Sequence, residues 1–134
     1  MIVEKFKNNN AALVVVFIAA TSLTGCASNQ YQVTYDTNPR AASIICGGQP
    51  QGYSPITLYY PKDAALNGVI NTSPCSAKWT SGAEATFQTR IDMTTFPSGV
   101  IYTAPRPDIP GYDIDARVAF EADQNRRQIN SQSQ

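Results

Sequence analysis

The side chains that could do chemistry are few in this chain of 134 residues. The chain has no histidine, so Ser–His–Asp and Cys–His arrangements are excluded, and the commonest transition-metal ligand is missing. The three cysteines, Cys26, Cys46 and Cys75, are the remaining reactive candidates. A thiol can carry a lipid, pair in a disulfide or bind a metal, and the sequence around each cysteine has to decide among these uses.

Cys26 closes an N-terminal segment with the features of a secretory signal. Lys5 and Lys7 outweigh Glu4 at its start, and an apolar run of about a dozen residues follows and ends near Leu23. This run is too short to cross a bilayer as a helix, which takes about 20 residues. The alternatives to a signal peptide are a short membrane helix and a buried core helix.

The stretch Leu23-Thr24-Gly25-Cys26 resembles the lipobox of bacterial lipoproteins, in which Leu, a small residue and Gly or Ala precede the Cys. The resemblance implies that residues 1–25 are a signal peptide and that Cys26 is lipidated and becomes the mature N-terminus. Two or three fatty chains make such attachment durable. Ala27 stands where that family has Asp in proteins kept at the inner membrane, so the resemblance implies an outer-membrane lipoprotein that faces the periplasm.

Cys46 and Cys75 are then the pair that remains in an oxidising compartment, which predicts a disulfide between them. The alternatives are two buried free thiols or a metal site, although two cysteines without histidine are a poor ligand set. The sequence contains no P-loop, no Gly-rich dinucleotide motif and no metal-ligand cluster. We therefore expect no cofactor and no bound metal.

The carboxylates are the last candidates for catalysis, because a paired-carboxylate site needs two of them. A Ser–Lys dyad with Lys62 or Lys78 has no supporting motif. After removal of the signal peptide, eight basic and nine acidic residues remain, so nothing attracts nucleic acid. These observations favour a protein that is not an enzyme. We expect most of the acids to lie on solvated surface: Asp36, Asp63, Glu84, Asp92, Asp108, Asp113, Asp115, Glu121 and Asp123.

Aromatic residues supply the candidate binding surface. A set of five rings could stack against a glycan strand or a partner protein, or could fill a small core instead. We single out Tyr53, Tyr59 and Trp79 as the possible surface. Tyr59 is the best candidate for exposure, because Leu58 and Tyr60 lie on the opposite face of the expected strand. The full set is Tyr53, Tyr59, Tyr60, Trp79 and Tyr102.

Strand patterns dominate the part of the chain that must position these residues. Residues 31–36 alternate strictly between apolar and polar side chains, and the Gly- and Pro-rich residues 47–52 are expected to form a hairpin loop. One helical turn is expected near Asp63–Leu66. The pattern predicts an all-β fold, a small antiparallel β-sandwich. Further strands are expected at 42–46, 55–60, 76–80, 85–93 and 100–103.

Residues 36–61 resemble the PEGA domain, a small β-module of bacterial envelope proteins. The motif places of that family are filled by Asn38-Pro39, Ala41-Ala42, Gly47-Gly48 and Gly52-Tyr53-Ser54-Pro55. The family usually has Gly where Ala41 stands, and it has Pro-Gly soon after the second strand, where this chain has Pro61-Lys62. The resemblance implies a binding or structural module without catalytic residues, here a lipid-anchored domain over residues 26–104.

Residues 105–134 form the last expected unit. The prolines of 104–112 indicate a semi-rigid linker, and residues 113–129 have a helical pattern with acids first and Arg126-Arg127 near the end. The apolar stripe of Ile114, Val118 and Ala122 is thin, so the helix would be marginal alone. Residues 130–134 are expected to be disordered. We expect this unit to be separable from the β-domain and to act as an interaction element.

Two functions remain for such a protein. The first is a structural or accessory lipoprotein, anchored in the membrane by its lipid, that docks onto an envelope protein. The alternative is a module that binds peptidoglycan or another envelope glycan. The sequence does not name the partner or the ligand.

Overall fold

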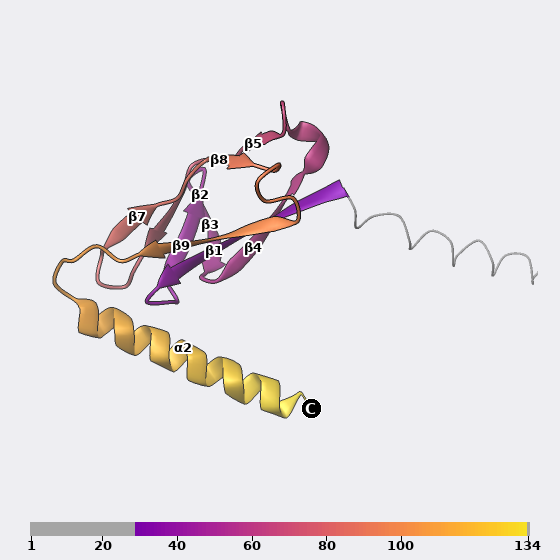
Figure 1. The fold of residues 1–134 in the computed structure, drawn as a ribbon. Coiled ribbons are helices and arrows are strands. Elements are labelled where there is room, and N and C mark those ends of the chain that lie inside the picture. Colours follow the sequence, from indigo (N-terminus) through magenta and orange to yellow (C-terminus); the bar gives the residue numbers. More distant parts are fainter. Residues whose placement is uncertain (1–28, 134) are drawn as a thin grey trace, which may run out of the picture. The chain divides into compact units, whose positions relative to one another are not determined.

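The computed structural model describes residues 29–133, so the predicted signal peptide and Cys26 lie outside the described residues. The described part is mainly β, with several sheets and one C-terminal α-helix (Figure 1), as the sequence predicts. The elements are β1 (Gln30–Asn38), β2 (Ser43–Cys46), β3 (Gln49–Tyr53), β4 (Ile56–Pro61), the 3₁₀-helix η3 (Lys62–Ala64), β5 (Val69–Asn71), β6 (Cys75–Lys78), β7 (Glu84–Thr86), β8 (Arg90–Asp92), β9 (Gly99–Pro105) and α2 (Tyr112–Gln132).

Within residues 29–133 the strands form three sheets, with the orders β4-β1-β9, β3-β2-β6-β7 and β5-β8. The pairs of the second and third sheets are antiparallel. β1 and β9 are parallel, with Gln32 opposite Gly99 and Asn38 opposite Pro105. The sequence predicts antiparallel strands, and this pair is an exception. Parallel strands must be joined by a long crossover. Here the crossover is the whole segment between β1 and β9, which no local pattern reveals.

The core begins with the inner face of β1. Tyr31, Val33 and Tyr35 are fully buried, which confirms the alternation seen in the sequence. Burial raises the pKa of the Tyr35 phenol, and its hydrogen bond with the Tyr60 hydroxyl, at 3.1 Å, raises it further, so the ring stays neutral. The other strands and the residues next to them add buried side chains to the same cluster: Ile44, Cys46, Ile70, Cys75, Ala77, Trp79, Ala83, Phe87, Ile91 and Ala104.

The hairpin around Gly47 differs from the expected one. The turn is Gly47-Gly48 alone, with φ of +58° and +80°, values that a two-residue hairpin loop requires. Residues 49–53, expected to be loop, form β3, which pairs with β2. β3 lies at the edge of its sheet. Proline has no backbone N–H to donate, so Pro50 is tolerated in an edge strand, which has no neighbouring strand on its outer side. β4, expected to pair with β2, joins β1 in the other sheet.

The segment 85–93 is also divided, although the sequence predicts one strand. β7 pairs with β6, and β8 pairs with β5 in a different sheet. Phe87 and Ile91 are buried on either side of the break. An alternating pattern marks which side chains point inward, but it does not mark where the chain leaves one sheet for the next.

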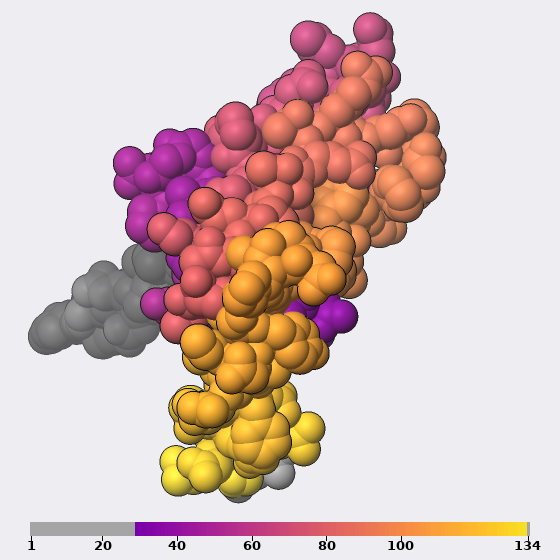
Figure 2. Space-filling model, turned by 90° about the vertical axis from the view of Figure 1, so that its left-hand side faces the viewer, coloured from indigo at the N-terminus to yellow at the C-terminus, as the bar shows by residue number. Residues whose placement is uncertain are grey.

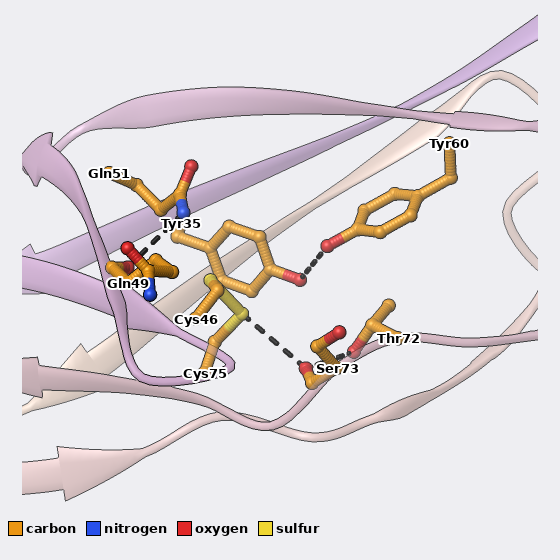
Figure 3. Close-up of a disulfide and its surroundings, with 8 residues drawn as sticks. All are labelled: Tyr35, Cys46, Gln49, Gln51, Tyr60, Thr72, Ser73 and Cys75. Atoms are coloured by element: carbon orange, nitrogen blue, oxygen red, sulfur yellow. Dashed lines mark hydrogen bonds between the residues drawn. A yellow bond between two sulfur atoms is a disulfide. The ribbon is translucent and has the colours of Figure 1, made fainter.

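The predicted disulfide is confirmed. Cys46 of β2 lies directly opposite Cys75 of β6, and their sulfur atoms are 2.09 Å apart. Both belong to the buried cluster that includes Tyr35, and Figure 3 shows the Tyr35 ring between the disulfide and Tyr60. The bond therefore joins two strands within the core.

Ala41 has a conformation unusual for an alanine. Its φ is +71°, in the left-handed region that glycine favours, and the residue is buried. Its N–H donates to the Ser54 carbonyl at 3.1 Å, and the Ser54 N–H donates to the Ala42 carbonyl at 2.8 Å. These two bonds fix the backbone where β1 ends. The left-handed φ is the reason why glycine would suit this position.

The disulfide should contribute about 3–4 kcal/mol to the free energy of unfolding, because it restricts the unfolded chain across a loop of 29 residues. Urea unfolding of the purified protein with and without a reductant measures this. The double variant Cys46→Ala/Cys75→Ala is the control and should not respond to the reductant. A wild-type protein equally stable in both conditions would contradict the prediction.

Replacement of Ala41 by Gly should change the free energy of unfolding by less than about 1 kcal/mol, because relief of the left-handed strain is offset by a more flexible unfolded chain. Ala41→Val should lower it by about 1–3 kcal/mol, because a β-branched residue is strained at this φ. Urea unfolding of both variants tests the pair. Equal stability of the Val variant and the wild type would show that the backbone adapts at little cost.

Candidate functional site

A buried ion pair joins the C-terminal helix to the β-domain. Arg106 follows β9, and Asp115 lies in the first turns of α2. The Arg106 Nε donates to the Asp115 Oδ2 at 2.6 Å, and the two side chains are 3% and 0% exposed. Asp115 also accepts the Ser81 N–H at 2.9 Å and the Ser81 hydroxyl at 2.6 Å. We call Arg106, Asp115 and Ser81 the clasp.

All the N–H groups of the Arg106 guanidinium are used within the clasp and its surrounding loop. Besides Asp115, Arg106 donates to the Ser81 hydroxyl oxygen at 3.1 Å. It donates to the carbonyls of Pro107, Ile109 and Pro110 at 2.9, 2.7 and 2.8 Å. A guanidinium has five N–H donors, so none is left for a ligand. The Pro-rich segment, expected from its composition to be a semi-rigid linker, is wrapped around this cation.

The clasp keeps the Asp115 carboxyl ionised. Burial alone would raise its pKa, but the hydrogen bonds from Ser81 and Arg106, together with the Arg106 charge, outweigh that effect and hold the pKa below its ordinary value. Asp115 therefore contributes its full stabilisation above its ordinary pKa near 4. The contribution is lost as the pH falls through the lowered pKa.

Gly111 allows the helix to approach Ser81. It precedes the helix with φ of +103°, and a Cβ at this position would lie 2.6 Å from the Ser81 Cβ. No side chain caps the helix N-terminus. Contact with the β-domain therefore replaces the usual capping residue at this end.

The sequence did not reveal the clasp. Asp115 was expected on solvated surface but is 1% exposed, and Asp36 is also buried, where it accepts from Arg40 Nε at 3.2 Å. The available signal was Gly111 directly before a helical pattern, in a segment with a lone arginine between two prolines. That signal suggests a close approach, but it does not name the partner of the arginine.

α2 itself is confirmed as a helix, and it is longer than expected. It continues to Gln132, so residues 130–132, expected to be disordered, are helical, and Arg126-Arg127 do not lie in its last turn. Asp115 is its one buried residue among those described. Figure 2 shows it as a surface element, orange at its start and yellow at its end. Several of its apolar side chains are exposed: Tyr112, Ile114, Phe120 and Ile129.

The residues proposed as an aromatic surface are not brought together. Tyr53 in β3 is 72% exposed and Tyr59 in β4 is 58% exposed, on strands of different sheets. Trp79 is 2% exposed, and its indole N–H donates to the Pro39 carbonyl at 2.9 Å. Trp79 is therefore a core residue, whereas the prediction that Tyr59 is exposed is confirmed.

Two shallow grooves flank Tyr53. The larger, about 400 Å³, lies between the β3–β4 corner and α2, where Asn125, Arg126 and Ile129 line it. The smaller, about 230 Å³, is lined by Lys78 and Trp79. Ala41 lines both grooves. An exposed ring with a cation on each side could contact a flat, polar ligand.

No group of three or more His, Cys, Asp or Glu side chains between residues 29 and 133 is placed to hold a metal ion. No helix in that part is long and apolar enough to span a membrane. Every buried polar side-chain atom there has a hydrogen-bond partner.

Replacement of Asp115 by Asn should lower the free energy of unfolding by about 3 kcal/mol, because it leaves the Arg106 charge buried without its partner. The matched control is Asp123→Asn on the same helix. Asp123 pairs with Arg127 in solvent, so this change should cost less than about 0.5 kcal/mol. Circular dichroism during urea unfolding measures both variants.

The pH dependence gives a second readout of the same pair. The wild type should lose stability as the pH falls below about 4, and the Asp115→Asn variant should lose less over that range, because its side chain does not titrate. Identical acid profiles of the two proteins would contradict a stabilising role for the Asp115 charge.

Comparison with known proteins adds no relative. No protein-family model, no curated protein and no solved structure matches this chain. A function for it must therefore be inferred from the clasp, the helix that it holds and the surfaces around them.

Proposed function

We propose that the protein is a non-enzymatic lipoprotein of the bacterial envelope, lipid-anchored at Cys26 in the outer membrane, and that α2 docks onto another envelope protein. The observation that carries the proposal is the contrast within α2. Its first turns are held by a buried, fully hydrogen-bonded clasp, while Phe120 and Ile129 further along are exposed. Such a helix is fixed in place and remains available to a partner.

The proposal includes a small β-sandwich as the supporting domain. The buried cluster draws side chains from both larger sheets, which supports a layered arrangement. The ring of Tyr35 in β1 contacts the ring of Phe87, directly after β7, edge to face at 4.9 Å between centroids. The left-handed backbone of Ala41 supports kinship with the PEGA domain, because that family usually has glycine at this place.

The absence of an enzymatic role is proposed from the state of the polar groups. Catalytic groups usually have perturbed pKa values and face a cleft that can hold a substrate. Here the buried guanidinium of Arg106 donates all its N–H groups to the protein itself. Its partner Asp115 is held ionised by the same contacts. Both groups are explained by attachment of the helix.

The docking surface is proposed to be apolar and not electrostatic. Asp123 on α2 is paired with both Arg126 and Arg127, which reduces the field that any of these charges projects. Phe120, which is exposed, is the largest apolar side chain in the middle of the helix. Aromatic side chains in such positions often carry much of the energy of an interface. We therefore take Phe120 as the centre of the surface.

A glycan-binding role is the second candidate, and the grooves that flank Tyr53 favour it. Lys78 lines one of the two grooves next to Tyr53, and Asn125 and Arg126 line the other. A ring with hydrogen-bond donors at both edges can hold a sugar by stacking and by polar contacts. Cosedimentation with purified cell-wall sacculi tests this candidate, and Tyr53→Ala should abolish it.

The main proposal predicts position-dependent crosslinking in cells. A photoreactive amino acid at position 120 should crosslink one envelope protein, and the same residue at position 59, exposed on β4, should not crosslink that protein. The change Asp115→Asn should reduce the crosslink by loosening the helix. Equal crosslinking from positions 120 and 59, or none from position 120, would contradict a docking role for α2.

The anchor is tested separately by metabolic labelling with a palmitate analogue. The wild type should be labelled and Cys26→Ser should not. A Cys26→Ser variant that is still labelled and still fractionates with the outer membrane would overturn the lipid anchor.

A further inference from the structure

We propose that the end of the β-domain where β1 begins rests on the lipid surface through four exposed side chains, Tyr59, Leu66, Phe96 and Ile101, and that α2 therefore begins on the side away from the membrane. We call these four residues the anchor-end patch. The inference rests on the proposed lipid anchor at Cys26, and it adds an orientation that the anchor alone does not give.

The first step is the length of the tether. Only three residues lie between Cys26 and Gln30, where β1 begins, so four Cα-to-Cα steps join the two residues. Even fully extended, they span at most about 14 Å. A lipid chain at Cys26 inserts in the bilayer, so the start of β1 is kept close to the headgroups. With so short a connection, the end of the domain where β1 begins cannot move far from the membrane surface.

The second step is the position of Phe96 and Ile101. The Tyr31 hydroxyl, at the start of β1, donates to the Phe96 carbonyl at 2.6 Å. Ile101 lies opposite Thr34 in the parallel pair, near the start of β9. Both residues line one shallow groove of about 480 Å³. Phe96 is 44% exposed and Ile101 is 69% exposed.

The third step is the position of Tyr59. The hydroxyls of Ser54 and Thr57 bond to those of Thr37 and Thr34, so later residues of this segment lie beside earlier residues of β1. Tyr59 therefore lies towards the start of β1, on the same exposed face as Thr57. A tyrosine at this place suits the headgroup region, where its ring and hydroxyl contact both environments.

Leu66 completes the patch. It is 74% exposed and lies between η3 and β5. The adjoining Gly68 carbonyl accepts the Met93 N–H at 2.8 Å, which brings this connection next to the one that leads to Phe96. Figure 1 shows η3, the β8–β9 connection and the start of β1 on the same side of the β-rich part, and Figure 2 shows the magenta and salmon atoms of the two connections side by side at the top.

Apolar contact and not charge would hold this end at the membrane. Lys62 and Asp63 lie next to each other in η3 and oppose each other in sign. Four large apolar side chains near one end, beside a short lipid tether, form a surface suited to the headgroup–acyl boundary. The clasp and α2 follow the opposite end of the β1–β9 pair. From Gly99 to Pro105 this pair is about 20 Å long.

The experiment uses full-length lipidated protein in vesicles of phosphatidylethanolamine and phosphatidylglycerol that contain brominated phosphatidylcholine, which quenches nearby tryptophan. Phe96→Trp places a reporter in the patch, and Ile101→Trp is a second reporter. Tyr112→Trp is the matched control, because Tyr112 is an exposed aromatic residue at the start of α2. Trp79 is buried and common to all the proteins, so wild-type emission is the baseline.

We expect the emission at positions 96 and 101 to be quenched and to shift to shorter wavelength, and the emission at position 112 to be unaffected. Flotation of the same samples tests the anchor, because the wild type should float with the vesicles and Cys26→Ser should not. Protein that floats without quenching at 96 and 101, or with equal quenching at 112, overturns the orientation and leaves the anchor standing. Wild-type protein that does not float overturns both.

Discussion

The parallel pairing of β1 with β9 is the constraint on which the arrangement of the molecule depends. It joins the first strand of the described chain to the last, and it makes both run in the same direction. The chain therefore enters the β-domain at one end of this pair and leaves it for α2 at the other. With an antiparallel pair, the chain would leave β9 at the end where β1 begins. The separation of the proposed anchor from the proposed docking helix follows from this direction of β9.

The clasp fixes the position of α2 where the chain leaves β9. A helix with a thin apolar stripe gains little from its own sequence, so its position has to come from contacts with the domain. A buried ion pair is not an efficient source of stability in general, because both charges lose their water. Here the loss is offset by several hydrogen bonds from fixed backbone and side-chain groups, and these bonds work only in one geometry. Such a network places α2 precisely, and this suits the role proposed for α2 as a contact surface.

The proposed kinship with the PEGA domain rests on the backbone of one residue, Ala41. Glycine is usual in the PEGA family at the position of Ala41, and the backbone there is left-handed. The same bend lets Ser54 bond to the backbone at Ala41 and Ala42 and to the Thr37 hydroxyl, so it closes the corner between β1, β2 and β4. Tyr53 leaves this corner towards solvent, between its two grooves. The left-handed conformation of Ala41 thus connects the buried core to Tyr53, the most exposed aromatic ring of the domain.

The sequence by itself determined the local features. The alternation of β1, the burial of Tyr31, Val33 and Tyr35, the exposure of Tyr59 and the presence of a C-terminal helix were predictable, because each depends on a period of side chains along a few residues. The disulfide was predictable because Cys46 and Cys75 were the cysteines left after the lipobox resemblance assigned Cys26.

Only the tertiary structure decided which segments meet. The direction of β9, the division of 85–93 between two sheets, the burial of Trp79 and the partner of Arg106 all involve residues far apart in the chain. Asp115 has the composition of a solvated helix start, and it is buried because Ser81, 34 residues earlier, lies against it. Local periodicity carries no information about such pairings, since their free energy arises from packing and hydrogen bonds that form only when the whole domain is assembled.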